Sequence, residues 1–412
     1  MVKAVILAAG KGTRLEPLTE TRPKCLIQVM GKSFLYYILN NLKHSGYKEI
    51  AIVVGYKKEM IKQFCKEYNF KVTFIEQKQQ KGTGDAIKVT KDFVKKDDFI
   101  VLMSDNLYSR EDLKAIKKKD SLNYIVGFKH EHPEKFGVLI QEKGFLKKIV
   151  EKPKLAKSNL INTGLYKLTP KIFNILDKIK RTKRGEYEIT DALTLLAQQK
   201  KVKVFQAKDY WLDFGYPWDI FKVNEFLLTH TKEYRNGSIS KDAHLQGKVI
   251  VEKGAEIKAG VNIMGPVYIG KNCNIGPNCY IRGHTSLSDN VHVGAASEVK
   301  NSIIMNDTNI PHHNYVGDSI IGAHINLGSG TKIANLRHDN GNVKVTIKGK
   351  KMDSERRKIG AIIGDNVKVG INASIMPGVK IGSNCMVGPS VIMYKDLPRG
   401  KCIFLKQQHE IH

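Results

Sequence analysis

Residues 4–15 read AVILAAGKGTRL, and this stretch decides how the first part of the chain folds. The apolar run over residues 5–9 predicts a buried β-strand, which breaks into the loop GKGTR at residues 10–14. Glycine lets a backbone come close to a ligand with its N–H groups turned inward, and Lys11 and Arg14 add positive charge. The stretch therefore predicts an anion-binding loop at the end of a strand, although the spacings of a P-loop and of a dinucleotide fingerprint are both absent.

Short apolar runs alternate with amphipathic segments after this loop. The expected strands cover residues 50–54, 72–75 and 99–103, and the expected helices cover 34–45, 59–68 and a segment from about 85. Such alternation predicts a parallel, doubly wound α/β sheet with right-handed crossovers. Ligands of these sheets bind beyond the carboxyl ends of the strands, so we expect Gly10 and Asp105 at one edge.

Two motifs resemble those of the sugar-1-phosphate nucleotidyltransferases. The first is L-A-A-G-x-G-T-R-L, followed by a Pro-Lys pair that ends at Lys24, and the second is YWLDFGYPWD at residues 210–219. The resemblance implies a Rossmann-like domain that transfers a nucleotidyl group to a sugar phosphate and releases pyrophosphate. It implies catalytic roles for Arg14 and Lys24 and metal binding by Asp105 and Asp213. Magnesium suits such a site because it prefers oxygen ligands and needs few carboxylates.

The same resemblance implies further substrate contacts. Those expected to bind the nucleotide are Leu7, Ala9, Gly10, Gly12, Thr13, Gln77, Gly82 and Thr83. Those expected to bind the sugar are Gly137, Glu151 and Asn162. The side chain of Gln77 offers a donor and an acceptor together, as the edge of uracil or thymine requires, so UTP and dTTP both remain open.

In the second half, an aliphatic residue recurs at every sixth position. The runs extend from Ile239 to Met305, from Ile321 to Ile333 and from Ile363 to Met393. No α-helix has this period, which predicts a parallel β-helix of hexapeptide repeats. Cys273, Cys279 and Cys385 fall on a second inward position of the repeat and are interpreted as packing residues. The repeats resemble the left-handed β-helices of acyltransferases, which assemble as trimers.

Two segments interrupt the period, and insertions in solenoids often build sites. Residues 306–316 contain the string PHHNY, and residues 334–358 are rich in Lys and Arg. The basic segment could hold the phosphates of coenzyme A, or it could be a solvated insertion.

The complete layout resembles the bifunctional enzymes that acetylate glucosamine-1-phosphate and then uridylylate the product, particularly their archaeal branch. The expected domains are a nucleotidyltransferase over residues 1–235 and a β-helix acetyltransferase over residues 236–412. The resemblance implies acetyl-CoA as a substrate and His312 as catalytic base, with adjacent His313 as a competitor. It implies galactosamine-1-phosphate as a second acceptor. The residues that it implies for substrate binding in acetyl transfer are Arg282, Lys300, Tyr315, Asn326, Asn335 and Lys344.

Composition is compatible with this interpretation. The 68 Lys and Arg against 40 Asp and Glu give a formal net charge of +28, which suits anionic substrates. We expect no nucleic-acid partner, since no binding motif is present, and no membrane span, since no apolar run reaches about 20 residues. We further expect a cytoplasmic homotrimer or dimer of trimers. Two alternatives stay open: a nucleotidyltransferase whose β-helix is structural or allosteric, and a non-catalytic scaffold resembling exchange-factor subunits.

Overall fold

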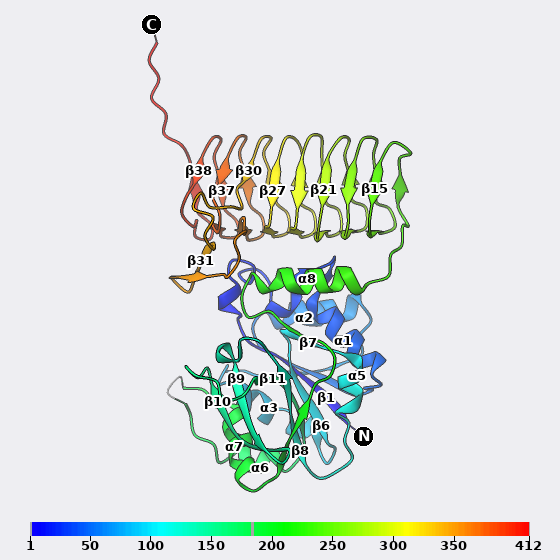
Figure 1. The fold of residues 1–412 in the computed structure, drawn as a ribbon, viewed down its shortest axis with the longest axis vertical. Coiled ribbons are helices and arrows are strands. Elements are labelled where there is room, and N and C mark those ends of the chain that lie inside the picture. Colours follow the sequence, from blue (N-terminus) through cyan, green and yellow to red (C-terminus); the bar gives the residue numbers. More distant parts are fainter. Residues whose placement is uncertain (1, 183–184, 412) are drawn as a thin grey trace. The chain divides into compact units, whose positions relative to one another are not determined.

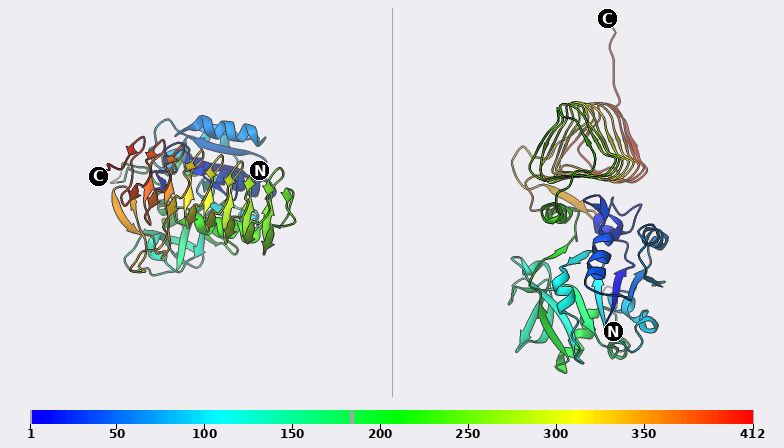
Figure 2. Two further views of the ribbon diagram at one scale, coloured as in Figure 1. Left: turned by 90° about the horizontal axis from the view of Figure 1, so that it is seen from above. Right: turned by 90° about the vertical axis from the view of Figure 1, so that its right-hand side faces the viewer.

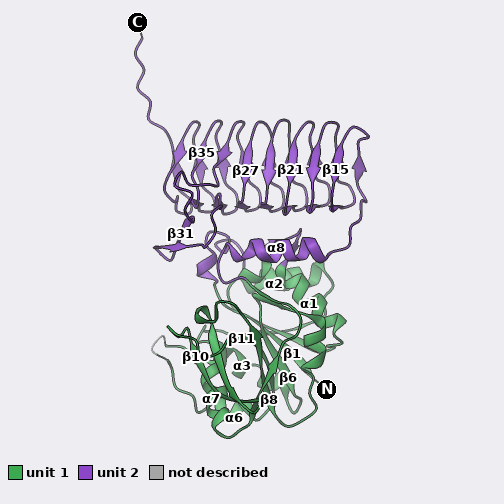
Figure 3. Cartoon of the chain, in the orientation of Figure 1, with its two compact units in different colours: residues 1–11, 23–26, 34–213 green, residues 12–22, 27–33, 214–412 purple. Residues whose placement is uncertain are grey.

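The computed structural model describes residues 2–182 and 185–411 (Figure 1). The chain separates into two compact units, and each is described by itself (Figure 3). Unit 1 comprises residues 1–11, 23–26 and 34–213, and unit 2 comprises residues 12–22, 27–33 and 214–412. Within the described ranges, no helix has the length and apolar character needed to cross a bilayer.

Unit 1 is an α/β unit built on a nine-stranded sheet. Its helices are α1 (Phe34–His44), α2 (Lys58–Glu67), α3 (Thr83–Lys88), α4 (Lys91–Val94), α5 (Arg110–Ala115), α6 (Ile172–Leu176) and α7 (Ile189–Gln198). The strands of the large sheet are β1 (Lys3–Ala8), β4 (Ile50–Val54), β5 (Thr73–Glu76), β6 (Phe99–Met103), β8 (Asn123–Lys129), β9 (Gly137–Glu142), β10 (Phe145–Glu151), β11 (Leu160–Leu168) and β12 (Val202–Gln206). A separate pair consists of β7 (Asn106–Tyr108) and β13 (Trp211–Asp213).

The strand order is β5-β4-β1-β6-β11-β8-β12-β10-β9. The first four strands in this order are parallel, which confirms the expected doubly wound arrangement. Strand β11 runs antiparallel to both β6 and β8, so the rest of the sheet is mixed. Alternate residues such as Val5, Leu7 and Val101 are buried in one core with residues of α3, α6 and α7.

Lys167 on β11 is buried without any exposed side-chain surface. Its Nζ lies 2.7 Å from Asp98 Oδ2 and donates to the carbonyl oxygens of Asp120 (2.8 Å) and Leu122 (2.9 Å). Lys167→Met is expected to lower the free energy of unfolding by about 3 kcal/mol, because Asp98 loses its partner and two carbonyls lose their donor. Urea unfolding of the full chain measures the change, and the exposed Lys154→Met is the control. Equal changes in both variants would contradict this account.

Unit 2 contains α8 (Asp219–His230), a small hairpin of β2 (Gln28–Val29) and β3 (Lys32–Ser33), and a parallel β-helix. The first sheet of the β-helix consists of β14 (Ser238–Ile239), β17 (Glu256–Ile257), β20 (Asn274–Ile275), β23 (His292–Val293), β26 (Asn309–Ile310), β29 (Asn326–Leu327), β34 (Lys368–Val369), β37 (Met386–Val387) and β39 (Cys402–Ile403). The second sheet consists of β15 (His244–Gln246), β18 (Asn262–Met264), β21 (Tyr280–Arg282), β24 (Glu298–Lys300), β27 (Tyr315–Gly317), β30 (Lys332–Ile333), β35 (Ser374–Ile375) and β38 (Ile392–Met393). The third sheet consists of β16 (Val249–Val251), β19 (Val267–Ile269), β22 (Thr285–Leu287), β25 (Ile303–Ile304), β28 (Ile320–Ile321), β33 (Ile362–Ile363) and β36 (Lys380–Ile381).

The three sheets enclose a triangular cross-section (Figure 2). This confirms the parallel β-helix that the six-residue period predicted, and it fits the left-handed form that the resemblance to acyltransferases implied. Cys273, Cys279 and Cys385 are buried in its core, as expected. Burial raises the pKa of Cys273 and of Cys279 to about 12, so neither thiol is reactive near neutral pH.

The two predicted interruptions differ in outcome. Residues 334–358 leave the β-helix as an antiparallel hairpin of β31 (Lys344–Ile347) and β32 (Lys350–Asp353), as expected. The prediction that residues 306–316 interrupt the β-helix is wrong. This segment continues the β-helix through β26 and β27, with Ile310 and Val316 pointing inward. Before this segment the phase of the repeat shifts by one residue, so that Ile304 packs inside the β-helix, while Met305 is buried outside that cluster.

Candidate active sites

The predicted anion-binding loop begins at the carboxyl edge of the parallel strands. Leu7 on β1 pairs with Met103 on β6, and the N–H of Ser104 donates to the Leu7 carbonyl (3.2 Å). The carbonyl of Ala9 accepts from Gln80 Nε2 (2.8 Å), which holds the loop start in place. Because a methyl group added at Gly10 would meet no atom within 4 Å, Gly10 faces open space. Leu7, Ala9, Gly10 and Asp105 thus lie at one edge, as expected.

The continuation of this loop belongs to unit 2. Gly12 has φ +67°, and the 3₁₀ turn Thr13–Leu15 follows it. The Arg14 guanidinium carbon lies 5.3 Å from the ring centre of Tyr216, and that ring stacks on Trp218 at 4.9 Å. The motif FGYPWD therefore supplies an aromatic surface for Arg14. The sequence interpretation assigned no role to Tyr216.

The two predicted metal-binding aspartates lie in adjoining positions of unit 1. The Nζ of Lys24 donates to Asp105 Oδ2 at 2.5 Å, and Asn106 Nδ2 donates to Asp105 Oδ1 at 3.0 Å. Asp213 on β13 pairs with Asn106 on β7, the residue next to Asp105. Burial raises the pKa of Tyr108 well above its ordinary value, and the negative charges of Asp105 and Asp213 add to this shift. Lys24, Asp105 and Asp213 are therefore brought together.

The donor set fits magnesium. In the part of the chain that the structure describes, no group of three or more His, Cys, Asp or Glu side chains could hold a metal ion. Magnesium needs no such cage, because it takes one or two carboxylates together with substrate phosphates and water. Asp105 and Asp213 could hold it in that way.

Gln77, Gly82 and Thr83 come together at the start of α3. The buried Gln77 donates through Nε2 to the Gly82 carbonyl (3.2 Å) and to Asp85 Oδ2 (2.8 Å). The Thr83 hydroxyl donates to Glu188 Oε2 (3.0 Å) and accepts from a backbone N–H (3.0 Å) at the start of α7. The Thr83 side chain thus has a structural role, and the amide nitrogen of Gln77 already has two acceptors.

Gly82 has φ +100° and ψ 179°, a conformation that only glycine adopts without strain. A methyl group there would lie 2.5 Å from the Tyr187 carbonyl oxygen. We expect Gly82→Ala to cost about 1–3 kcal/mol and to lower kcat/KM for nucleotidyl transfer about tenfold, since the loop must shift. Gly144→Ala is the control, because Gly144 has φ +80° but open space around it. Pyrophosphate release measures both, and equal activities would contradict the expectation.

The predicted sugar-binding residues also come together. Gly137 on β9 pairs with Glu151 on β10, and a methyl group at Gly137 would lie 2.9 Å from Glu151 Oε2 and 3.7 Å from Asn162 Cβ. Trp211 packs against Phe136 with ring centres 5.6 Å apart, and its indole N–H donates to Asn106 Oδ1 (3.0 Å). Trp211 and Asn106 therefore link the sugar side to Asp105. The sequence interpretation missed both because the contact between them joins positions that are 105 residues apart in the chain.

Four of the predicted acetyl-transfer residues gather on or beside the second sheet of the β-helix. Arg282 on β21 pairs with Lys300 on β24, and Tyr315 lies on β27, the next strand. Asn335 Nδ2 donates to the Tyr315 hydroxyl (3.2 Å). Arg282 Nε lies 2.9 Å from Glu298 Oε1. Burial raises the pKa of Tyr315, and the charges of neighbouring carboxylates add to the shift.

The other three predicted residues lie elsewhere in unit 2. Asn326 is exposed on β29 of the first sheet, and Lys344 is exposed on the hairpin strand β31. His312 is exposed at the corner between β26 and β27, where the N–H of Gly330 donates to its carbonyl (3.1 Å). His313 is also exposed, with φ +51°, and Lys332 Nζ donates to its carbonyl. Both histidine side chains can therefore reach solvent.

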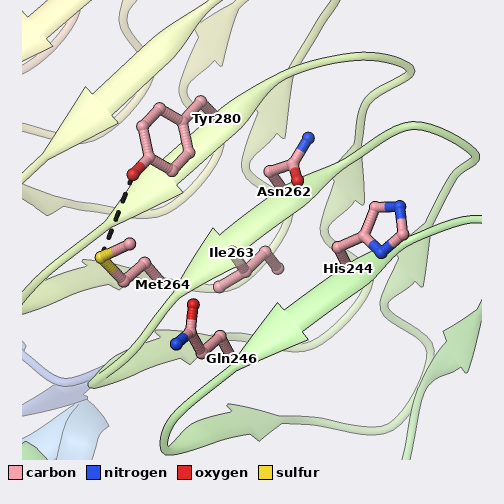
Figure 4. Close-up of a pocket in the computed structure, with 6 residues that line it drawn as sticks. All are labelled: His244, Gln246, Asn262, Ile263, Met264 and Tyr280. Carbon is pink, nitrogen blue, oxygen red and sulfur yellow. Dashed lines mark hydrogen bonds between the residues drawn. The ribbon is translucent and has the colours of Figure 1, made fainter.

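A pocket of about 350 Å³ lies on the same sheet, nearer its first strands. His244, Gln246, Asn262, Ile263, Met264 and Tyr280 line it (Figure 4). None of these is a predicted site residue, although Met264 pairs with Arg282.

Family models match three parts of the chain. Nucleotidyl transferase matches residues 3–230, GMPPB C-terminal domain matches residues 263–357, and Bacterial transferase hexapeptide (six repeats) matches residues 360–395. Among solved structures, a putative glucose-1-phosphate thymidylyltransferase from Bacillus anthracis in complex with a sucrose is 27% identical with a TM-score of 0.51. That match covers 57% of this chain and 98% of the other.

Two relatives match almost the complete chain. A bifunctional sugar-1-phosphate nucleotidylyltransferase/acetyltransferase from Sulfurisphaera tokodaii is 44% identical over 97% of this chain and 99% of its own. A bifunctional protein GlmU from Methanocaldococcus jannaschii is 44% identical over 98% of each chain. The shared identity extends through both units, and the chain therefore belongs to the family of bifunctional sugar-1-phosphate nucleotidylyltransferase/acetyltransferases.

Proposed function

We propose that this enzyme makes a nucleotide sugar in two steps, on two sites of one chain. Residues 1–235 transfer UMP or dTMP from the triphosphate to a hexose-1-phosphate and release pyrophosphate. Residues 236–412 transfer the acetyl group of acetyl-CoA to the amine of glucosamine-1-phosphate, with galactosamine-1-phosphate as a second acceptor. The observation that carries the proposal is that each predicted set, Lys24 with its aspartates and Lys300 with Tyr315 and Asn335, assembles within one unit.

In the first reaction, a sugar-phosphate oxygen attacks the α-phosphorus while pyrophosphate leaves. Negative charge gathers at one centre; Asp105 and Asp213 would hold Mg²⁺, which would supply compensating positive charge there. Lys24 neutralises the phosphate oxygens, and its contact with Asp105 orients its ammonium group. Arg14 is assigned a catalytic role from its motif alone, and within unit 2 its guanidinium lies against the ring of Tyr216.

In the second reaction, the amine of the sugar attacks the thioester carbonyl, a C–N bond forms and the C–S bond breaks. His312 takes the proton from the attacking amine and returns it to the departing sulfur of coenzyme A. Arg282 and Lys300 bind the phosphate of the amino sugar. The basic hairpin that includes Lys344 supplies charge for the phosphates of coenzyme A.

The assembly and compartment are part of the same proposal. Hexapeptide β-helices of this class form trimers, so we propose a homotrimer or a dimer of trimers. All six cysteines are free thiols, as expected in the reducing cytoplasm where nucleoside triphosphates and acetyl-CoA occur.

The test measures both activities in the intact chain. Thiol release is followed with acetyl-CoA and each amino-sugar phosphate, and pyrophosphate release is followed with UTP or dTTP, Mg²⁺ and a hexose-1-phosphate. Turnover in both assays supports the proposal. Pyrophosphate release without thiol release would reduce the β-helix to an assembly or regulatory role, and a folded chain without either turnover would be a scaffold.

A further inference from the structure

Asp318 is a buried carboxylate beside the candidate acetyl-transfer site. It follows β27 directly, with φ +48°, and only 4% of its side chain is exposed. Its backbone N–H donates to the Lys300 carbonyl (2.9 Å), and its carbonyl accepts from the N–H of Gly360 (2.8 Å). Because an isolated buried charge is costly, the partners of this carboxylate decide what it does.

Three side chains donate to it. Lys300 Nζ donates to Oδ2 at 3.0 Å, Asn335 Nδ2 donates to the same oxygen at 2.5 Å, and Asn301 Nδ2 donates to Oδ1 at 2.6 Å. Lys300 ends β24, Asp318 follows β27 and Asn335 follows β30, so the three residues stand on successive coils. Asn301 alone could satisfy one oxygen, but the other oxygen is shared by two candidate substrate ligands.

The chemistry of a carboxylate fixes how Asn335 is oriented. A carboxylate only accepts hydrogen bonds, so the amide nitrogen of Asn335 must face Asp318. The same nitrogen also donates to the Tyr315 hydroxyl (3.2 Å). The amide oxygen of Asn335 is thereby directed away from Asp318, where it can accept from a hydroxyl or amine.

Lys300 is held in a similar way. One of its three N–H groups is used by Asp318, and two stay free to meet a phosphate. A long, flexible side chain loses conformational entropy when it binds a ligand, and this loss weakens binding. A contact that already orders the side chain removes most of that cost.

We propose that Asp318 is a positioning residue for acetyl transfer: it fixes the Lys300 ammonium toward the sugar phosphate and the Asn335 amide oxygen toward the sugar. The inference rests on the proposed function of this site. Asp318 itself does not touch substrate, and it acts through two side chains that do.

Asp318→Asn tests this with little change in volume. The substitution removes the negative charge that pairs with Lys300, and an amide nitrogen in the position of Oδ2 opposes the donors of both Lys300 and Asn335. We expect KM for glucosamine-1-phosphate to rise about tenfold or more, with KM for acetyl-CoA and pyrophosphate release both unchanged. The control is Asp289→Asn, the same charge change in the same β-helix, where Asp289 accepts from the backbone N–H of Lys271 (2.9 Å).

A double-mutant cycle with Lys300→Met separates positioning from a general structural role. If Asp318 acts through Lys300, the combined effect on KM is smaller than the product of the two single effects. If the change in KM of the double variant equals the product of the two single changes, the inference is overturned. An unchanged KM in Asp318→Asn would also overturn it. If Asp318→Asn does not fold, Asp318→Glu retains the charge but moves the oxygens, and an unchanged KM there would also overturn it.

The wild-type chain distinguishes the two levels of the argument. If the wild type releases thiol and the variants have a normal KM for glucosamine-1-phosphate, only the role of Asp318 is contradicted. Absence of thiol release from a folded wild type overturns the proposed function, and the inference with it.

Discussion

Replacing Asp105 by Asn is expected to reduce nucleotidyl transfer by about a thousandfold and to leave acetyl transfer unchanged. Asp105 follows β6 at the loop edge of the sheet, and it contacts Lys24 (2.5 Å) and Asn106 (3.0 Å). The substitution removes the negative charge that both Mg²⁺ and the Lys24 ammonium require while retaining the shape of the side chain. Pyrophosphate release and thiol release, measured on the same preparation, check the two halves of the expectation.

The matched control is Asp97→Asn. Asp97 precedes the opposite end of the same strand, and its partly exposed carboxylate lies 3.3 Å from Nζ of the buried Lys3. Lys3 keeps its contacts with Glu49 (3.3 Å) and the Phe93 carbonyl (2.8 Å), so this substitution should not affect turnover. Full pyrophosphate release by Asp105→Asn would show that the metal assignment is wrong, and loss of both activities would indicate unfolding instead.

The parts of the fold that were predictable have a repeating local cause. The apolar run before Gly10 and the alternation that follows it define β1, β4 and β6, because a strand buried on both faces must be apolar throughout. In the second half, the inward residues recur at a fixed interval because each flat face of the β-helix takes the same number of residues. The mixed pairing of β11 had no such local signal, since strand direction depends on the path of the chain.

The phase of the β-helix shows a limit of the periodic argument. The period predicted Met305 as inward, but Ile304 lies in the core because an earlier turn is one residue shorter. A six-residue period can still be read from the sequence when one turn is a residue shorter. Stacked strands must stay in register, so the inward position moves by one residue. Asparagine at the corners, as at Asn290 with φ +61°, was a signal that could have located the turns.

The candidate sites were predictable only as residue types at motif positions. Motifs identified Lys24 and Asp105, but they gave no reason to choose Asn106, whose amide contacts Asp105 and accepts from Trp211. Asp318 was not predicted as a site residue, and its partners come from the coils on either side. Such contacts join residues that are distant in the sequence, so spacing along the chain carries no information about them.

Replacing His312 by Ala is expected to lower thiol release from acetyl-CoA by about a thousandfold, the scale of a lost general base. The backbone of His312 is held by Gly330 of the following coil (3.1 Å), so the loss of an exposed imidazole should leave the corner intact. Pyrophosphate release should be unchanged. Kinetics of thiol release with saturating glucosamine-1-phosphate measure the effect on kcat.

His313→Ala is the matched variant, because both histidines are exposed at the same corner and differ by one position. His313 has a positive φ, and its carbonyl accepts from Lys332, so its backbone has a role in the turn. An alanine at this position can keep the same backbone conformation at some cost in strain. We therefore expect His313→Ala to keep most of the thiol release that His312→Ala loses. The reverse result would move the catalytic base by one residue, and equal activity in both variants and the wild type would mean that neither imidazole takes the proton.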